Sequence, residues 1–455
     1  MKIPCAERLP FIVCGLSFLQ PALTNSQFQN LTLIATALVL GAKFSLTEIS
    51  KMWLKEKSIS ALSEFFSNAK FSTKEMNHLY ALQVLNTYNI SGGYFIIDDT
   101  MKHHSKFCKW IHGSSFLFDH AVNANLNATC LVFLYYSDGA LIKFPICFRV
   151  FYQEKSKMPW RLGKQIKHKT KYDLAVEMLE WAIKIGFPKS TVLADSWFGI
   201  APFIKELKRL KLSYVLEIKS NYTIKRNCKE PKLTPTGRLA KNQYDEIPLP
   251  NYFKTIISYV VCGFAADKET GKKEKAFYNV KIATLRLKSI PGKHRIIESV
   301  DPVKQTTKYL LTNQLTWEGT KIISNYSHRW VIEEFFRNAK QLTDMEGATI
   351  RSEQGVTLSL CLVSWIDFLL HLENYKLSTA GKLPKEPLTV PSIVRQAQFD
   401  NLVAFIGRVK NEEDFIPKWL EVEKEYIERK RKTHYELVEI DKTNTEQKIA
   451  LEICQ

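Results

Sequence analysis

Three acidic residues stand where they could hold a divalent cation. Asp98 follows the apolar, β-branched run 94–97, Asp195 follows a second such run at 191–194, and both runs predict buried strands. If the two strands are neighbours, both carboxylates meet in one cleft, where a cation must offset their repulsion. Carboxylate oxygens of this kind suit Mg²⁺ or Mn²⁺. Either aspartate alone is more typical of a turn or a helix N-cap, so a metal site needs further support.

The third acid, Glu333, lies in a segment with helical periodicity. On a wheel with about 100° per residue, Tyr326, Arg329, Glu333 and Lys340 fall within about 60° of one another, and Arg337 lies close to them. The apolar face holds Val331, Ile332, Phe335, Phe336, Ala339 and Leu342. The polar stripe combines one metal-binding acid with cations suited to phosphate oxygens. An ordinary amphipathic helix with a mixed polar face gives the same wheel.

The order of these motifs carries a resemblance to a known family. Asp98-Asp-Thr comes first, Ala-Asp195-Ser-Trp-Phe-Gly second, and Tyr-x2-Arg-x3-Glu333-x6-Lys third. In this order they resemble the DDE transposases of bacterial insertion sequences, specifically the group with the Tyr-Arg-Glu-Lys signature and a β-strand insertion. The resemblance covers about residues 25–372.

The resemblance implies a fold, a chemistry and a set of partners. The fold is an α/β, RNase H-like mixed-sheet core interrupted by a β-rich insertion, with helical N-terminal and C-terminal regions. Asp98, Asp195 and Glu333 are the expected catalytic residues and hold two Mg²⁺ (or Mn²⁺) ions. The DNA phosphate-binding residues are expected to be Tyr326, Arg329, Lys340 and Arg337.

The implied reaction is two-metal phosphoryl transfer on double-stranded DNA. A transposase cuts the terminal inverted repeats of its element and joins the 3′-OH to target DNA. We expect a homodimer on DNA, in the bacterial cytoplasm at the nucleoid, without a membrane partner. A metal-dependent nuclease without strand transfer and a non-catalytic DNA-binding relic are the alternative functions.

Two neighbouring pairs of acids leave a choice open. Asp98 and Asp99 point to opposite faces of a strand, so only one of them serves, and the Asp-x-Thr form favours Asp98. Glu334 falls off the polar stripe that carries Glu333, which favours Glu333.

Other residues near the motifs have plainer interpretations. His103 and His104 follow the first motif and are expected to be solvated or to face phosphate, although a metal role stays open. Trp197 and Phe198 are expected in the core. Trp317 lies in the insertion, and we assign it no role.

The elements that must position these residues alternate along the chain. Three strands (94–97, 130–136 and 140–151), a helix (172–186), a strand (191–194), a helix (198–210) and a strand (213–218) follow residue 93, which predicts an α/β layer architecture. The later runs 255–262, 276–287 and 309–312 alternate like antiparallel strands. The predicted regions are 1–90 (helical, with DNA binding and plain packing equally open), 91–220 (first part of the core), 221–320 (β-rich basic insertion), 321–372 (last part of the core, with the Glu333 helix) and 373–455 (C-terminal helical region).

Charge and composition agree with a DNA partner. The chain has 455 residues and a net charge of +18. Residues 201–300 carry 21 Lys and Arg against 9 Asp and Glu, and a second basic run spans 155–171. We interpret both as phosphate-binding surface rather than as merely solvated faces. The nine cysteines show no CxxC spacing, so neither a cysteine zinc site nor a disulfide framework is predicted.

The N-terminal stretch between Arg8 and Lys43 contains no charged residue. Pro21 and the polar block at 24–30 divide it into apolar pieces shorter than the roughly 20 residues that a membrane span needs. We therefore expect a buried helical layer there rather than a membrane segment.

Overall fold

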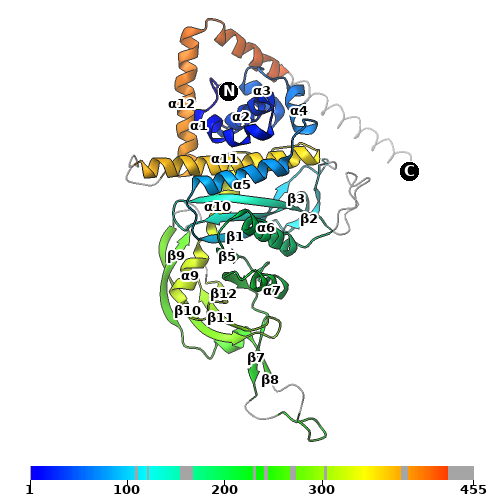
Figure 1. Cartoon of the computed structure of the whole chain (residues 1–455), viewed down its shortest axis with the longest axis vertical. Coiled ribbons are helices and arrows are strands. Elements are labelled where there is room, and N and C mark those ends of the chain that lie inside the picture. Colours follow the sequence, from blue (N-terminus) through cyan, green and yellow to red (C-terminus); the bar gives the residue numbers. More distant parts are fainter. Residues whose placement is uncertain are drawn as a thin grey trace, which may run out of the picture.

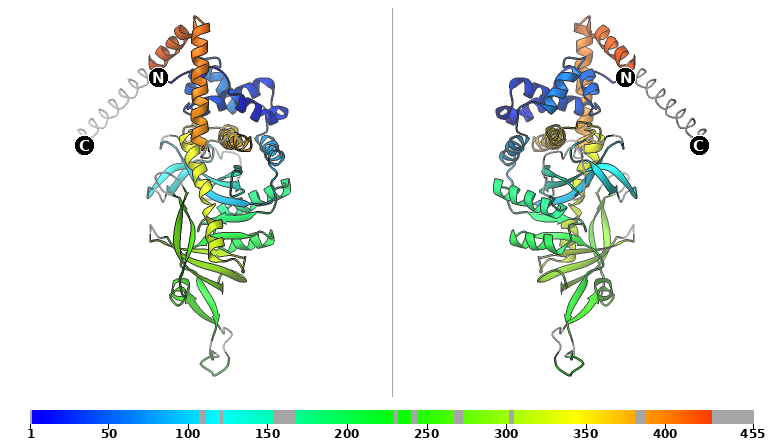
Figure 2. Two further views of the ribbon diagram at one scale, coloured as in Figure 1. Left: turned by 90° about the vertical axis from the view of Figure 1, so that its left-hand side faces the viewer. Right: turned by 90° about the vertical axis from the view of Figure 1, so that its right-hand side faces the viewer.

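The computed structural model places a large sheet between helices at one end and a β-rich insertion at the other (Figure 1). It describes residues 2–106, 108, 111–119, 122–153, 168–228, 232–239, 244–266, 273–301, 305–380 and 388–428. Most of the basic run at 155–171 and the end of the chain beyond residue 428 lie outside these residues. Figure 2 shows the same arrangement from two sides, with the N-terminal helices and the insertion at opposite ends.

A ten-stranded mixed sheet forms the centre of the molecule. Its first six strands are β1 (Tyr94–His103), β2 (Ser115–Asp119), β3 (Ala124–Ser137), β4 (Lys143–Phe151), β5 (Thr191–Ala194) and β6 (Tyr214–Ile218). The strand β1 is antiparallel to β3 and parallel to β5, which is in turn parallel to β6. With β4 beside β3, the order β4-β3-β1-β5-β6 is the mixed α/β core that the sequence predicts.

These strands form because their apolar residues are buried on both faces. Phe95, Ile96 and Ile97 of β1 are each 0% exposed, which fits a continuous apolar run rather than an alternating one. The helix α6 (Lys171–Ile185) packs on β3 and β4, and α7 (Ala201–Arg209) follows β5. One boundary prediction was wrong, because β1 continues through Asp98 to His103, where it stays paired with β3.

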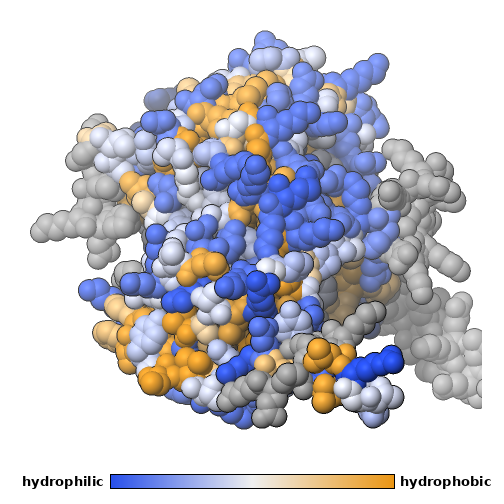
Figure 3. Space-filling model, turned by 60° about the horizontal axis from the view of Figure 1, so that its bottom comes forward, coloured by the Kyte–Doolittle hydropathy of each residue, from blue (hydrophilic) through white to orange (hydrophobic). Residues whose placement is uncertain are grey.

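The insertion extends the sheet instead of forming a separate one. Its elements are β7 (Thr223–Asn227), β8 (Tyr244–Pro248), α8 (Leu249–Phe253), β9 (Tyr259–Ala266), β10 (Lys273–Arg286), β11 (Lys293–Val300) and β12 (Thr307–Thr312). Antiparallel pairing of β12 with β6 joins the insertion to the core. The sequence predicted β9, β10 and β12 but not β11 or the β7–β8 hairpin. Viewed from this end, the surface combines hydrophilic and apolar areas (Figure 3). Val260 of β9 and Phe277 of β10 are among the exposed apolar residues of the insertion.

Helices cover the core at the other end. They are α1 (Pro10–Gly15), the 3₁₀ helix η1 (Ser17–Ala22), α2 (Asn25–Val39), α3 (Leu46–Met52), α4 (Ile59–Ser67), α5 (Thr73–Thr87), α10 (Trp330–Gln341), α11 (Glu353–Thr379) and α12 (Val390–Asn411). The helix α9 (Gly319–Ser327) lies instead against β9 and β6, on the side of the insertion. Residues 415–428 are also helical. The uncharged N-terminal stretch forms α1, η1 and α2, and eleven residues of α2 are buried, as expected for a helical layer.

The helix α11 is the central support of this helical end. Its 27 residues have a window of mean hydropathy 1.7, long and apolar enough to cross a membrane, yet 94% of that window is buried inside the protein. It contacts β4, α5, α12 and α10. Burial of this kind is what the core helix of a folded domain shows.

Candidate active site

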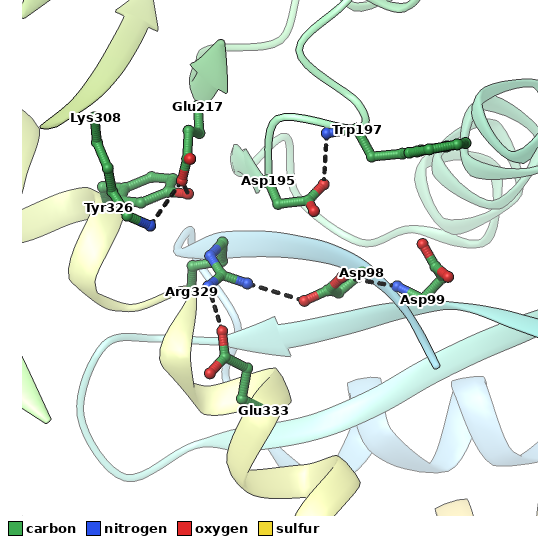
Figure 4. A network of polar contacts seen from close by, with 9 residues as sticks. All are labelled: Asp98, Asp99, Asp195, Trp197, Glu217, Lys308, Tyr326, Arg329 and Glu333. Carbon is green, nitrogen blue, oxygen red and sulfur yellow. Dashed lines mark hydrogen bonds and ion pairs between the residues drawn. The ribbon is translucent and has the colours of Figure 1, made fainter. Parts of the chain in front are cut away.

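The sheet register brings Asp98 and Asp195 together. The parallel pairing of β1 with β5 ends at Ile97 and Ala194, so the next residue on each strand is an aspartate. Neighbouring strands lie about 4.8 Å apart, which places the two side chains at one level of the sheet. The two acids therefore lie close together, as the sequence predicted, because β1 and β5 pair in this register (Figure 4).

Arg329 links Asp98 to Glu333. Its Nη1 donates to Asp98 Oδ2 at 2.9 Å, and its Nη2 donates to Glu333 Oε1. The Arg329 side chain is 14% exposed and Asp98 is 15% exposed, so this ion pair is largely shielded from water. Glu333 thus joins Asp98 through a shared guanidinium.

The segment that carries Arg329 and Glu333 is not the single helix that the sequence predicts. α9 ends at Ser327 and α10 begins at Trp330, with Arg329 as its N-cap residue. At the junction, Arg329 N donates to Tyr326 O at 3.0 Å, a bond to the residue three positions back, which tightens the turn as in a 3₁₀ helix. The apolar side of α10 is buried as predicted, and its Phe335 and Phe336 rings lie against Phe133 of β3.

Burial controls the protonation of the two aspartates. It raises the pKa of Asp98 to about 7, an effect that Arg329 opposes and the charges of Asp195 and Asp99 reinforce. Burial also raises the pKa of Asp195, again opposed by Arg329 and reinforced by Asp99. The Arg329 guanidinium therefore does not fully offset the combined effect of burial and of the neighbouring negative charges.

Glu217 is a further acid at this site that the sequence analysis missed. Pairing of β5 with β6 sets Ala194 opposite Leu216, so Glu217 lies level with Asp195, and its charge raises the pKa of Asp195. Its Oε2 accepts from Tyr326 Oη at 2.8 Å and from Lys308 Nζ at 2.9 Å. The signal was present in the sequence, because Glu217 stands within the apolar run 214–218 that predicts a strand next to the site.

The expected phosphate-binding residues make contacts within the protein. Tyr326 faces Glu217, and Lys340 of α10 donates to Met101 O at 3.2 Å and pairs with Glu346 at 3.0 Å. Arg337 is half-buried on α10. Lys340 therefore lies beside β1, and Tyr326 and Lys340 would each have to exchange a protein partner for phosphate.

The competing acids have partners of their own. Asp99 Oδ2 accepts from Lys171 Nζ at 2.8 Å, and Glu334 pairs with Lys143 of β4 at 2.9 Å. Only Asp98 and Glu333 share Arg329 in the part of the chain that the structure describes, which agrees with the preference for these two.

Three neighbouring side chains differ from expectation. Trp197 was predicted in the core but is 49% exposed. Its backbone N–H donates to Asp195 Oδ1 at 3.0 Å, and Lys171 Nζ lies 4.8 Å from the centre of its ring. Phe198 is buried as predicted. His103 bonds Asp119 at 2.8 Å and His104 bonds Thr129 at 2.9 Å, so neither is simply solvated. Burial lowers the pKa of His104 to about 3, which keeps its imidazole neutral.

The donor set fits a hard divalent cation. In the described ranges, no three His, Cys, Asp or Glu side chains form a ready-made metal cluster. Arg329 bridges Asp98 and Glu333 instead. Carboxylate oxygens are the ligands that Mg²⁺ and Mn²⁺ prefer. Burial is the main reason for the raised pKa of Asp98, and the charges of Asp195 and Asp99 add to it, so a cation bound here would favour the ionised carboxylate.

Two family models match the chain. The model described as DDE superfamily endonuclease matches residues 19–252, and the model described as Transposase DDE domain matches residues 152–366. Asp98 lies within the first match, Glu333 within the second and Asp195 within both. No curated protein matches the chain.

Proposed function

The chain belongs to the DDE superfamily of endonucleases, and we propose that it is a DNA transposase of a bacterial insertion sequence. It would cut the ends of its element and join the resulting 3′-OH to target DNA. The observation that carries the proposal is the register in which Ile97 pairs with Ala194, because it sets Asp98 beside Asp195. The match to a transposase domain over residues 152–366 favours strand transfer over cleavage alone.

In this proposal Asp98, Asp195 and Glu333 hold two Mg²⁺ or Mn²⁺ ions. When bound, such ions supply Lewis-acid activation for in-line attack on a phosphodiester. The three carboxylates would hold these ions at β1, at the end of β5 and at α10. Arg329 balances the charge of Asp98 and Glu333, and its guanidinium would also suit a phosphate oxygen.

The remaining roles follow the same geometry. Tyr326, Arg329, Lys340 and Arg337 would contact DNA phosphate next to the cleaved bond. Glu217 keeps Tyr326 and Lys308 in place beside Asp195. We further propose that the protein works as a homodimer on paired element ends, in the bacterial cytoplasm at the nucleoid.

The test is cleavage of the DNA that flanks the reading frame. Wild type with Mg²⁺ should nick a duplex of that DNA and leave a 3′-OH at the element end, whereas Asp195→Asn should not. The matched control is Asp400→Asn on α12, an exposed aspartate that bonds Gln396. Equal nicking by wild type and Asp195→Asn contradicts the catalytic assignment.

A supercoiled target plasmid in the same reaction separates the three candidate functions. A transposase should join the element end to the plasmid. Nicking without a joined product identifies a nuclease, and binding without nicking identifies a relic.

A further inference from the structure

A pocket of about 350 Å³ opens beside Asp195, outside the cluster of acids. Three segments line it: the loop after β5, the link from β6 to β7, and the end of β10. Its polar lining residues are Ser196, Lys219, Asn221, Thr223, Lys288 and Ser289. Ser196 is the residue after Asp195, so the pocket begins at the edge of the candidate active site.

The walls of the pocket are fixed by close backbone contacts. A Cβ at Gly199 would lie 2.0 Å from the carbonyl oxygen of Glu217, so only glycine allows the β5 loop to approach β6 this closely. Tyr222 Oη donates to Gly199 O at 2.8 Å, and Lys288 N donates to Thr223 O at 2.8 Å. The core and the insertion are therefore joined at the pocket, and its shape does not depend on a ligand.

The lining suits an anion. Hydroxyl, amide and ammonium groups can all donate hydrogen bonds, and no carboxylate from the described part of the chain lines the pocket. Lys288 is already paired with Glu246 at 2.7 Å. Lys219 makes no ion pair with a described carboxylate, and its Nζ lies 6.0 Å from the ring of Trp197. Lys219 thus supplies the uncompensated positive charge at the pocket.

We propose that this pocket binds a backbone phosphate of the DNA strand that passes Asp195. This rests on the proposed function, which brings a DNA strand to Asp195, and it adds a site on the insertion side of that acid. Ammonium together with hydroxyl donors is the usual way in which proteins contact DNA phosphate without reading sequence. The net charge of residues 201–300, from 21 basic and 9 acidic residues, favours the same ligand.

The strand can come from the element end or from the target. The probes are a labelled duplex of the DNA flanking the reading frame and a labelled duplex of arbitrary sequence. Binding of the full chain is measured by fluorescence anisotropy over a range of KCl concentrations, with EDTA present to prevent cleavage. The variants are Lys219→Gln and the neutral pair Asn221→Ala with Ser289→Ala. The control is Lys74→Gln, which removes an exposed charge on α5.

In a plot of log affinity against log salt concentration, the negative slope of Lys219→Gln should be less steep than that of wild type by about 0.9. Its deficit relative to wild type should therefore shrink about 3-fold between 50 and 200 mM salt. The neutral pair should weaken binding without changing the slope, and Lys74→Gln should change neither. An effect on the flanking duplex alone assigns the element strand to the pocket, and an effect on both duplexes assigns the target strand as well.

The proposal is wrong if the salt dependence of binding of Lys219→Gln has the same slope as that of wild type on both duplexes. That result leaves the proposed function intact if wild type still nicks its element end. If wild type binds neither duplex, the proposed function itself fails.

Discussion

Arg329 is predicted to act as a substitute cation for the acidic cluster. Its guanidinium bonds Asp98 at 2.9 Å and also bonds Glu333, with side-chain exposures of 14%, 15% and 32% for the three residues. Arg329→Ala leaves two shielded carboxylates without a partner, which costs about 3–5 kcal/mol for a fully buried pair. Because Glu333 is one-third exposed, we expect the lower end, about 3 kcal/mol of unfolding free energy.

The matched control is Arg408→Ala. Arg408 also binds a carboxylate with two bonds, of 2.7 and 2.6 Å to Glu412, but the two side chains are 38% and 41% exposed. An exposed pair contributes at most about 1 kcal/mol. Arg408 also donates to Ala6 O at 3.1 Å and lies 4.4 Å from the centre of the Phe415 ring, so its variant should lose some stability, but less than Arg329→Ala. Urea unfolding at pH 8 with EDTA measures both losses.

Divalent ions should distinguish a charge-balancing role from a merely structural one. A ligand at 100 times its Kd stabilises the folded state by about 2.7 kcal/mol. In wild type the ion must displace Arg329 from Asp98 and Glu333, whereas in Arg329→Ala it meets no competitor. Saturating Mn²⁺ should therefore stabilise Arg329→Ala more than wild type, by about 1–3 kcal/mol. Equal gains in the two proteins, or a loss in Arg329→Ala no larger than in Arg408→Ala, refute this reasoning.

Three further predictions concern buried groups. Burial raises the folded-state pKa of Asp367 to about 7. Ionisation of Asp367 therefore lowers the stability of the folded protein as pH rises from about 4 to 7. The stability gained by Asp367→Asn, measured by urea unfolding, should be about 2 kcal/mol larger at pH 8 than at pH 5. A gain independent of pH would contradict this. Asp98 has a pKa of about 7 and must lose its proton to bind a metal ion. The affinity for Mn²⁺, measured by titration calorimetry, should therefore rise about tenfold from pH 6 to pH 8. A constant affinity would argue against Asp98 as a ligand. Gly199→Ala should lose about 1–3 kcal/mol of unfolding free energy because its Cβ would meet Glu217 O. Gly92→Ala is the control, because a Cβ there meets open space and should not change stability. Equal thermal stability of the two variants would exclude the clash.

Local patterns in the sequence were sufficient to predict most core elements. The run 191–194 is β5, and the amphipathic segment 172–186 is α6 within one residue at either end. Such elements are encoded by the periodicity of neighbouring residues, which is visible without the rest of the fold. The order of the three motifs, together with the strands around them, was enough to predict the mixed core.

What the sequence did not contain is how distant segments meet. The register that sets Ile97 against Ala194 depends on packing of the whole sheet, and so does the arrival of Glu217 beside Asp195. β11 was missed because its strand character depends on its two neighbours, β10 and β12.

The exposed position of Trp197 and the break before α10 were missed for a different reason. A large aromatic residue such as Trp197 is usually buried, and an unbroken apolar pattern usually indicates one continuous helix. At the site, the backbone N–H of Trp197 bonds Asp195 instead, and the chain forms a tightened turn at Arg329. Predictions from neighbouring residues therefore fail mainly in the segments next to the acidic residues.

The most direct test of the account is the position of bound Mn²⁺ in crystals of the protein. Anomalous scattering should place an Mn²⁺ ion within about 2.0–2.3 Å of carboxylate oxygens of Asp98 and Asp195, with Glu333 binding the same ion or a second one. Asp195→Asn crystals should lose that signal. Saturating Mn²⁺ with no peak at these carboxylates, or a peak that survives in Asp195→Asn, would contradict the central claim that the three acids form one metal-dependent site.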